Sequence, residues 1–190
     1  MFNFFERIKK NPIIAAINNL DNLDEALSSP CENIFLLTGN IFNLKEIASR
    51  VKSKDKGIYI DIDSIDGFSK DTWGLEYIVK NIRPHGIITT KENLVWLSKD
   101  LGAFTILRLF ILDSISLEKG IQSINSTKPH AVEIFPGIMP KIIKKILVET
   151  NVPIITSGLI MDIEDLGESL NAGAIAVSTN SKELWHCNYC

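Results

Sequence analysis

The sequence predicts a protein of the α/β class, folded as one small (β/α)8 barrel of the TIM type. Eight short apolar runs recur along its 190 residues, and segments with helical periodicity separate them. The runs begin about 18 to 28 residues apart, the length of a strand, a helix and two short loops. They are apolar on both faces, as parallel strands are when helices cover one side and a packed interior the other. An open doubly wound sheet is the alternative, but eight units favour the closed barrel.

The predicted strands are the apolar runs themselves. In chain order they are Ile13–Ile17, Ile34–Leu37, Ile58–Ile62, Gly86–Ile88, Phe104–Leu109, Ala131–Ile134, Pro153–Ile155 and Ala174–Val177. The chain is slightly shorter than the roughly 200 residues usual for this architecture, so we expect near-minimal loops.

The first helices have clear boundaries. Met1–Lys10 predicts a short amphipathic helix and not a signal peptide, because its charges follow its apolar residues instead of preceding them. Asp21 opens the next helix, which Pro30 ends. Asn43 opens another over Leu44–Val51, whose apolar residues share one face.

The later helices carry start and stop signals of the same kind. Asp71 opens one that Pro84 ends, and Lys91–Leu101 forms the next. Asp162 caps a further helix, which residues 171–173 close. We therefore expect a single barrel domain over residues 1–185, with a short C-terminal tail over residues 186–190.

Composition limits the classes of function. No run of 18 or more apolar residues appears, so we expect no membrane partner and a cytoplasmic location. The formal charge is −3 and the isoelectric point is about 5.6, whereas proteins that bind nucleic acid mainly through its phosphate backbone are usually basic. Any role on nucleic acid therefore requires a local basic patch or a surface completed by a homo-oligomer.

Three cysteines are too few for a secreted disulfide framework. Cys31 stands alone and is interpreted as a small packing residue. Cys187 and Cys190 form a C-x-x-C after His186, but no second ligand pair accompanies them, and we expect the tail to be mobile. We predict no metal and no cofactor.

Two strand ends predict a phosphate site. In this architecture, phosphate commonly lies in the loops after strands seven and eight, where a glycine allows close approach and hydroxyl groups donate hydrogen bonds. The candidate residues are Ser157, Gly158, Ser178 and Thr179. The alternative is that these are ordinary turn residues, with Asn180 and Glu183 forming a helix cap.

Charged residues fall at other strand ends on the same rim. Asp61 and Asp63 end the third strand, Arg108 lies near the end of the fifth, and Glu133 lies within the sixth. A carboxylate inside an apolar strand is costly unless it is paired or faces a wet site. We therefore expect Glu133 and Arg108 to point inward, near each other or near a ligand. An ion pair that only holds the barrel together is the alternative.

Catalysis is the competing function. Asp63 and Glu133 could act as acid and base, or as metal ligands, in a small enzyme that converts phosphosugars. No strand end carries the lysine that a Schiff-base aldolase needs, because Lys91, the nearest candidate, is expected to open a helix. His85 and His130 precede their strands and fall on the opposite rim. We therefore favour a protein without catalytic turnover.

The chain resembles the glycerol-3-phosphate-responsive antiterminator family from about Ile13 to Trp185. The similar segments are Ile13–Ile17, Phe35–Gly39, Ile60–Asp63, Asp66–Gly67, Gly86–Thr90, Arg108–Ser114, Glu133–Gly137, Pro140–Ile143, Gly158–Ile160, Ala172–Thr179 and Lys182–Trp185. The resemblance implies a cytoplasmic regulator that binds glycerol 3-phosphate and acts on the RNA leader of glycerol-utilisation messages, preventing premature termination of transcription.

The resemblance also assigns roles to residues. Ser157, Gly158, Ser178 and Thr179 would take the phosphate. Asp63, Arg108 and Glu133 would line the rest of the pocket. Arg108→Ala is then expected to abolish ligand binding and leave the fold intact.

Three departures from the family pattern stand close to these residues. Asp61 replaces an expected histidine and Leu107 an expected glutamine, and both are expected near the pocket, where they could change the ligand. Ser157 replaces the first glycine of an expected pair, but Gly158 retains the second.

The best basic cluster for RNA is Lys141, Lys144 and Lys145 on the helix after the sixth strand. A second cluster follows the helix after the second strand: Arg50, Lys52, Lys54 and Lys56. Both clusters have the alternative reading of solvated helix faces.

Overall fold

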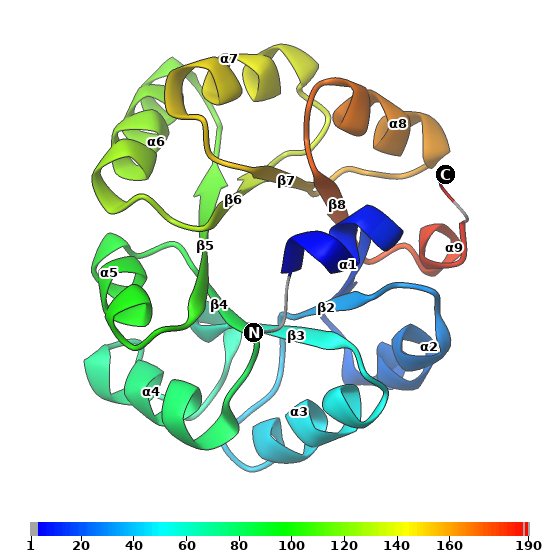
Figure 1. The fold of residues 1–190 in the computed structure, drawn as a ribbon, viewed down its shortest axis with the longest axis vertical. Helices are drawn as coiled ribbons and strands as arrows, with labels where there is room; N and C mark the ends of the chain where they lie inside the picture. The colour runs from blue at the N-terminus through cyan, green and yellow to red at the C-terminus, as the bar shows by residue number, and fades with distance from the viewer. Residues whose placement is uncertain (1–3, 188, 190) are drawn as a thin grey trace.

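The computed structural model describes residues 4–187 and 189, which form a closed barrel of eight parallel strands surrounded by helices (Figure 1). Each strand pairs with the next in the sequence, and β8 pairs with β1 to close the barrel. The predicted fold class is confirmed. The strands are β1 (Ile13–Ile17), β2 (Asn33–Leu36), β3 (Gly57–Asp61), β4 (Gly86–Thr89), β5 (Phe104–Phe110), β6 (Ala131–Phe135), β7 (Ile154–Ser157) and β8 (Ala176–Thr179).

The last two strands run further than the sequence predicts. Ser157 belongs to β7, and Ser178 and Thr179 belong to β8. An apolar-run criterion ends a strand at its first polar residue. In a barrel, however, alternate residues point into the interior, and the upper end of this interior is polar.

Helices occupy the segments between the strands. They are α1 (Phe4–Lys10), α2 (Leu23–Ser28), α3 (Leu44–Ser53), α4 (Thr72–Tyr77), α5 (Glu92–Asp100), α6 (Ser114–Thr127), α7 (Pro140–Thr150), α8 (Ile163–Asn171) and α9 (Lys182–Trp185). Short 3-10 turns, η1 (Leu20–Asn22) and η2 (Ile62–Ser64), precede α2 and follow β3. The segment η3 (Ile78–Ile82) continues α4 as a π-helix.

Most predicted helix starts hold. The Asp71 carboxylate accepts from the backbone N–H groups of the first turn of α4, and Asp162 does the same for α8. Asn43 precedes α3 without capping it, because its Oδ1 accepts instead from Asn40 N. Asp21 is not the opening cap of its helix: Asn19 accepts from Asp21 N, and the segment starts as a 3-10 turn.

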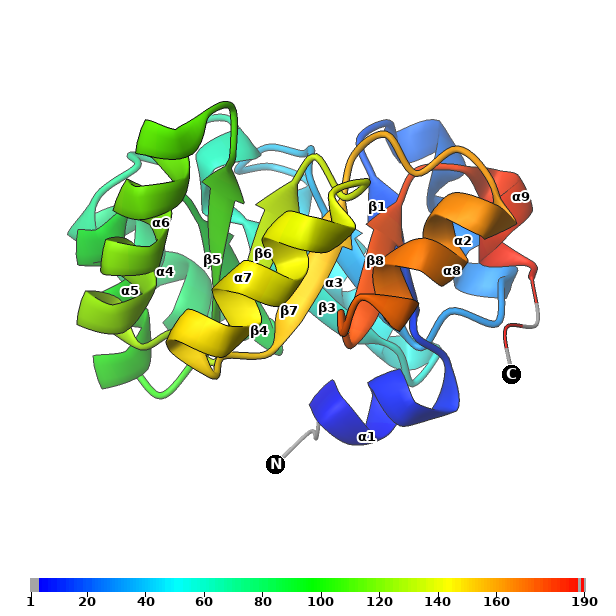
Figure 2. The ribbon, with the colours of Figure 1, turned by 90° about the horizontal axis from the view of Figure 1, so that it is seen from above.

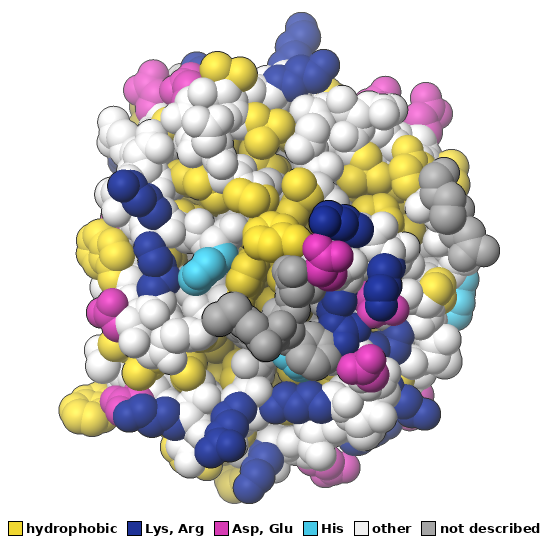
Figure 3. Space-filling view, viewed as in Figure 1, with side chains coloured by type: hydrophobic (Ala, Val, Ile, Leu, Met, Phe, Trp, Pro, Cys, Tyr) yellow, Lys and Arg dark blue, Asp and Glu magenta, His cyan; other side chains and the backbone are white. Residues whose placement is uncertain are grey.

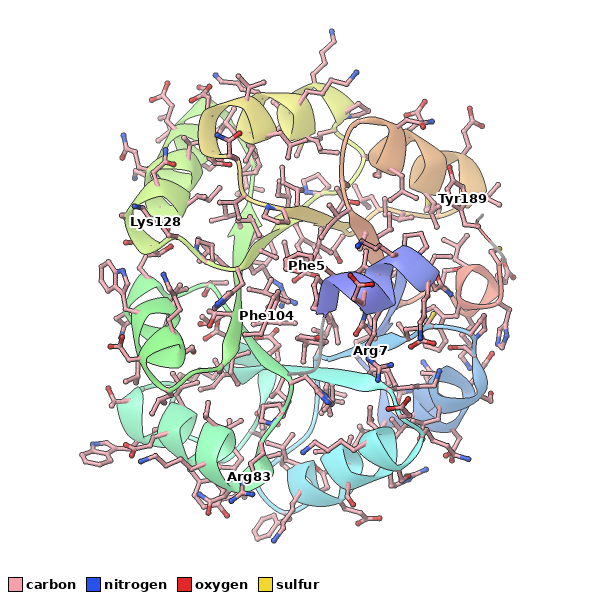
Figure 4. The ribbon with its side chains drawn as sticks, in the orientation of Figure 1. Phe5, Arg7, Arg83, Phe104, Lys128 and Tyr189 are labelled. Atoms are coloured by element: carbon pink, nitrogen blue, oxygen red, sulfur yellow. The ribbon has the colours of Figure 1, made fainter. Side chains whose placement is uncertain are left out.

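Helix α1 covers the N-terminal end of the barrel, on the side opposite the loops that follow β5, β6 and β7 (Figure 2). Phe4 is buried against Tyr59 and Phe104, with ring centroids 5.1 and 4.9 Å apart. On this face, apolar side chains lie beside α1, and Lys and Arg side chains line the edge over α3 and α4 (Figure 3). Phe5 points toward Phe104 from the same helix (Figure 4), at a centroid distance of 5.8 Å. Aromatic packing therefore closes this end of the barrel.

Both barrel histidines lie at this closed end, as predicted. His85 Nδ1 accepts from Ile58 N at 2.9 Å, and His130 Nδ1 accepts from Thr105 N at 3.0 Å. Burial lowers the pKa of His85 to about 4 and lowers the pKa of His130 as well. These imidazoles therefore serve as neutral acceptors for strand N–H groups.

The described part of the C-terminal tail packs against the barrel instead of standing free. Cys187 and Tyr189 are partly buried against the outer core, and the expected mobility of the tail stays a prediction. Cys190 lies outside the described residues. Cys31 is buried, and burial raises the pKa of its thiol to about 11, as expected for a packing residue. In the described part of the chain, no helix is long and apolar enough to cross a membrane.

Candidate functional site

A pocket of about 200 Å³ opens at the C-terminal ends of the strands, beside β7 and β8. Its polar lining is formed by Asn18, Ser157, Ser178, Thr179 and Asn180. Its apolar wall is formed by Ala16, Leu37, Phe135, Leu159 and Ile160, with Gly158 between the two groups. All four residues predicted to take a phosphate therefore lie together in one pocket.

Strand register brings the two serines side by side. Ser157 of β7 is the direct neighbour of Ser178 of β8, and its hydroxyl donates to the Ser178 carbonyl at 3.1 Å. The Ser178 hydroxyl is buried and has no hydrogen-bond partner among the described residues. A buried hydroxyl without a partner is costly, so this group is available to a ligand at little loss of protein contacts.

Thr179 has a structural task as well. Its carbonyl accepts from Trp185 Nε1 at 2.7 Å, and its hydroxyl accepts from Ser181 N at 3.1 Å. The indole of Trp185 is fully buried, so these contacts fix the end of β8. The alternative cap by Asn180 does not form, since the N-cap residue of α9 is Ser181 and no side chain caps the helix.

Gly158 is required by its neighbours. Its φ of +76° is a conformation that side-chain-bearing residues rarely adopt, and an added Cβ would lie 2.8 Å from the ring of Phe135. Its carbonyl also accepts from Gly137 N at 2.9 Å. The loops after β6 and β7 therefore pack tightly and form one rigid edge of the pocket.

Beside this pocket, the barrel interior holds a buried ionic triad of Arg108, Glu133 and Asp61. Arg108 Nε donates to Glu133 Oε2 at 2.7 Å, and Arg108 Nη1 donates to Asp61 Oδ2. The inward-facing Arg108–Glu133 pair was predicted, because the two residues are register neighbours on β5 and β6. Sequence reasoning did not include Asp61 in this pair.

The electrostatics of the triad follow from its burial. Burial raises the pKa of Glu133, and the Arg108 guanidinium and the nearby Ser157 hydroxyl oppose that rise. Burial alone would lower the pKa of Arg108, but Glu133 and Asp61 raise it above its usual value. Arg108 Nη2 has no hydrogen-bond partner among the described residues. The positive charge is thus largely neutralised inside the protein.

Phe135 lies between the triad and the pocket. Its ring lines the pocket, and the Arg108 guanidinium carbon is 5.2 Å from its centroid. Arg108 and Glu133 are not among the lining residues, although Arg108 contacts Phe135, which is one of them.

Asp63 occupies a different place. Its Oδ2 accepts from Thr90 N at 2.7 Å and from the hydroxyls of Thr90 and Thr89 at 2.9 and 3.1 Å. These contacts tie the loop after β3 to the loop after β4, away from the pocket lining. The structure does not bring Asp63 and Glu133 together as an acid–base pair, since each is engaged by different partners. No group of three or more His, Cys, Asp or Glu side chains with metal-binding geometry occurs among residues 4–187 and 189.

The expected position of Leu107 near the pocket is wrong. Leu107 is fully buried in the cluster between the barrel and its helices, together with Val95 and Leu117. Successive strand residues point to opposite faces, so a residue next to the inward Arg108 must point outward. Asp61, by contrast, faces inward and contacts Arg108 directly.

Sequence reasoning missed Asn18 and the role of Asn180. Both are exposed, and they line the pocket at the ends of the neighbouring strands β1 and β8. The signal was present for both, because each is the first polar amide after its strand. The adjacency of β1 and β8, which makes them neighbours, exists only once the barrel closes.

The three candidate RNA-contacting lysines are exposed on α7. Lys145 forms a loose ion pair with Glu149 at 3.9 Å, whereas Lys141 and Lys144 have no ion-pair partner in the described part of the chain. The second cluster is largely engaged. Arg50 pairs with Asp24, and Lys52 donates to Ile82 O.

A family model described as glycerol-3-phosphate responsive antiterminator matches residues 13–185. The chain is 33% identical over 178 residues to the uncharacterized protein YgcP of Escherichia coli, covering 94% of this chain and 93% of that protein.

Two crystal structures are similar over nearly the whole chain. A glycerol uptake operon antiterminator regulatory protein from Listeria monocytogenes matches with a TM-score of 0.89 and 29% identity, over 92% of this chain and 95% of that one. A glycerol uptake operon antiterminator-related protein from Thermotoga maritima matches with a TM-score of 0.82 and 32% identity, over 92% and 98%. Several aldolases match at 10–14% identity, which shows a shared fold alone.

Proposed function

This chain belongs to the glycerol-3-phosphate responsive antiterminator family, and we propose that it senses glycerol 3-phosphate in the pocket beside β7 and β8 and acts on RNA as a transcription antiterminator of glycerol metabolism. The protein works without catalytic turnover in this proposal. The single observation that carries it is the gathering of Ser157, Gly158, Ser178 and Thr179 in one small pocket.

The pocket suits a small phosphorylated polyol. At about 200 Å³ it is below the size that drug-sized ligands need, so it favours a compact molecule. The Ser178 hydroxyl has no partner among the described residues and can donate to a phosphate oxygen directly. The hydroxyls of Ser157 and Thr179 would do so by releasing their present acceptors, Ser178 O and Ile160 O, and the Gly158 backbone leaves room for the phosphate. The amides of Asn18 and Asn180 offer donors and acceptors to ligand hydroxyls.

The triad supports this pocket from behind. The Arg108–Glu133 ion pair holds β5 and β6 together. Arg108 also packs on the ring of Phe135, and so helps to position this part of the pocket lining. Asp63 fixes the neighbouring rim loops. Because two carboxylates offset the charge of Arg108, phosphate affinity in this proposal rests mainly on hydroxyl and backbone donors.

Calorimetric titration of the purified protein tests the ligand. We expect saturable binding of glycerol 3-phosphate, and no saturable binding of glycerol or inorganic phosphate at the same concentrations. Ser178→Ala removes one donor and should weaken affinity by about tenfold. Absence of binding to the wild-type protein would refute the ligand assignment, while equal affinity in the variant would refute the placement of the phosphate.

The RNA surface is assigned to Lys141, Lys144 and Lys145. Replacing all three with alanine should weaken binding of the leader RNA and make its salt dependence shallower, because fewer phosphates are neutralised. The matched control replaces Lys10, Lys45 and Lys70, which are also exposed and belong to neither candidate cluster, and should change RNA affinity little. Filter binding at several salt concentrations measures both effects. Equal losses in the two triple variants would show a general charge effect and contradict this surface.

A further inference from the structure

An arc of exposed apolar side chains runs along one side of the C-terminal rim. They come from three consecutive connections, after β5, β6 and β7, which are neighbours because these strands pair in order. Figure 2 shows these loops on the upper edge, away from α1. The members of this apolar arc are Phe110, Leu112, Ile115, Ile138, Leu159, Met161 and Ile163.

The arc is large enough for a stable protein contact. Its side chains are 42–83% exposed, and at this size each presents on the order of 100 Å². The sum exceeds the apolar patches of roughly 300–600 Å² found on typical monomers. A standard interface takes about 800 Å² from each partner, of which somewhat more than half is apolar. The arc therefore matches one side of such an interface.

The charges beside the arc exclude anionic occupants. Asp113 caps α6 and Asp162 caps α8, the helices on either side of α7, and Glu164 and Asp165 follow in the first turn of α8. These carboxylates repel nucleic acid and anionic lipid. Lys141 lies between the two acidic caps, in the first turn of α7.

This order of charges is complementary to itself. In a two-fold contact the same patch meets its own copy, with apolar side chains at the centre. Lys141, flanked by two aspartates, can then face an aspartate of the other copy at the edge of the contact. Of the three lysines assigned to RNA, Lys144 and Lys145 stay outside the contact, further along α7. The two α7 helices would bring their lysines to one dimer, which offers a basic surface that a single chain of net charge −3 provides only in part.

We propose that a second copy of this chain docks on the apolar arc and forms a two-fold homodimer over the C-terminal rim. The contact also concerns the pocket, because Leu159 belongs both to the arc and to the pocket lining, and Phe110 contacts the ring of Phe135 at 5.3 Å between centroids. On the proposed function, ligand binding and dimerisation are therefore linked.

Sedimentation velocity without ligand, from low to high micromolar concentration, tests the interface. The wild-type protein should be a dimer, and Leu112→Asp and Met161→Asp should each raise the dimer dissociation constant by about tenfold or more. Both positions are highly exposed in the monomer, so the variants should keep the wild-type circular dichroism spectrum. The control is Val148→Asp, which changes an apolar side chain of 82% exposure about 12 Å along α7 from the rim. It should remain dimeric.

A wild-type protein that stays monomeric would overturn the homodimer, and so would arc variants that dimerise as the wild type does. If the wild-type protein is monomeric and Leu112→Asp loses RNA binding, the arc would be assigned to RNA instead. The proposed ligand is tested separately, by calorimetry on Leu112→Asp. This variant leaves every pocket residue in place, so it should bind glycerol 3-phosphate even where the dimer is lost.

Discussion

Arg108→Ala is expected to lower the free energy of unfolding by about 3–5 kcal/mol near neutral pH. The guanidinium is buried and donates to Glu133 and Asp61, so its removal leaves two buried carboxylates without their cationic partner. Chemical denaturation followed by circular dichroism measures the loss. This result would replace the sequence-based expectation of an intact fold, because a residue that holds two strands cannot be removed for its ligand contacts alone.

The loss of unfolding free energy in Arg108→Ala should depend on pH in a defined direction. Burial raises the pKa of Glu133 and Arg108 opposes that rise, so without Arg108 the carboxyl binds its proton at a higher pH. A carboxyl whose pKa is raised by folding costs the protein no stability below the unfolded-state pKa of that carboxyl. The free energy of unfolding then falls as the pH rises through the folded-state pKa. The difference between the variant and the wild type should therefore be largest near neutral pH and smallest near pH of about 4.

Neutral replacement of the partners provides the control for Arg108→Ala. Adding Asp61→Asn and Glu133→Gln removes both orphaned charges, and this triple variant should recover most of the lost stability at neutral pH. An Arg108→Ala protein as stable as the wild type would contradict the structural role of the triad. A triple variant no more stable than the single one would show that packing, not charge, sets the cost.

Asn180→Asp is expected to weaken glycerol 3-phosphate binding by about tenfold to a hundredfold. The substitution is nearly isosteric and adds one negative charge at the edge of the pocket, where it repels the ligand phosphate. Asn180 is exposed, so the folded structure should be unaffected and the thermal midpoint nearly unchanged. Calorimetry with glycerol 3-phosphate measures the affinity.

The control for Asn180→Asp is Asn93→Asp, which makes the same change on the exposed face of α5. It should bind the ligand as the wild type does, at the same ionic strength. Equal weakening in both variants would show a long-range charge effect, and unchanged binding in Asn180→Asp would place the phosphate away from the end of β8.

Local sequence pattern was sufficient for the barrel. Each strand from β1 to β6 begins and ends within one residue of its predicted range, because buried parallel strands are continuous apolar runs with helical periodicity between them. The errors fall where polar residues enter the structure. The β7 and β8 strands were ended too early, since Ser157 and Ser178 face a polar interior that the run itself does not reveal.

By itself the sequence determined the fold, the family resemblance, the inward direction of Glu133 and Arg108, and the residues at the ends of β7 and β8. These depend on periodicity and on the rule that parallel strands end on one rim. Only the tertiary structure decided that Asp61 completes the triad, that Leu107 points outward, that Asp63 binds rim loops, and that Asn18 and Asn180 line one pocket. Each of these outcomes depends on contacts between segments distant in the chain, which are set by strand register and barrel closure and leave no trace in local spacing.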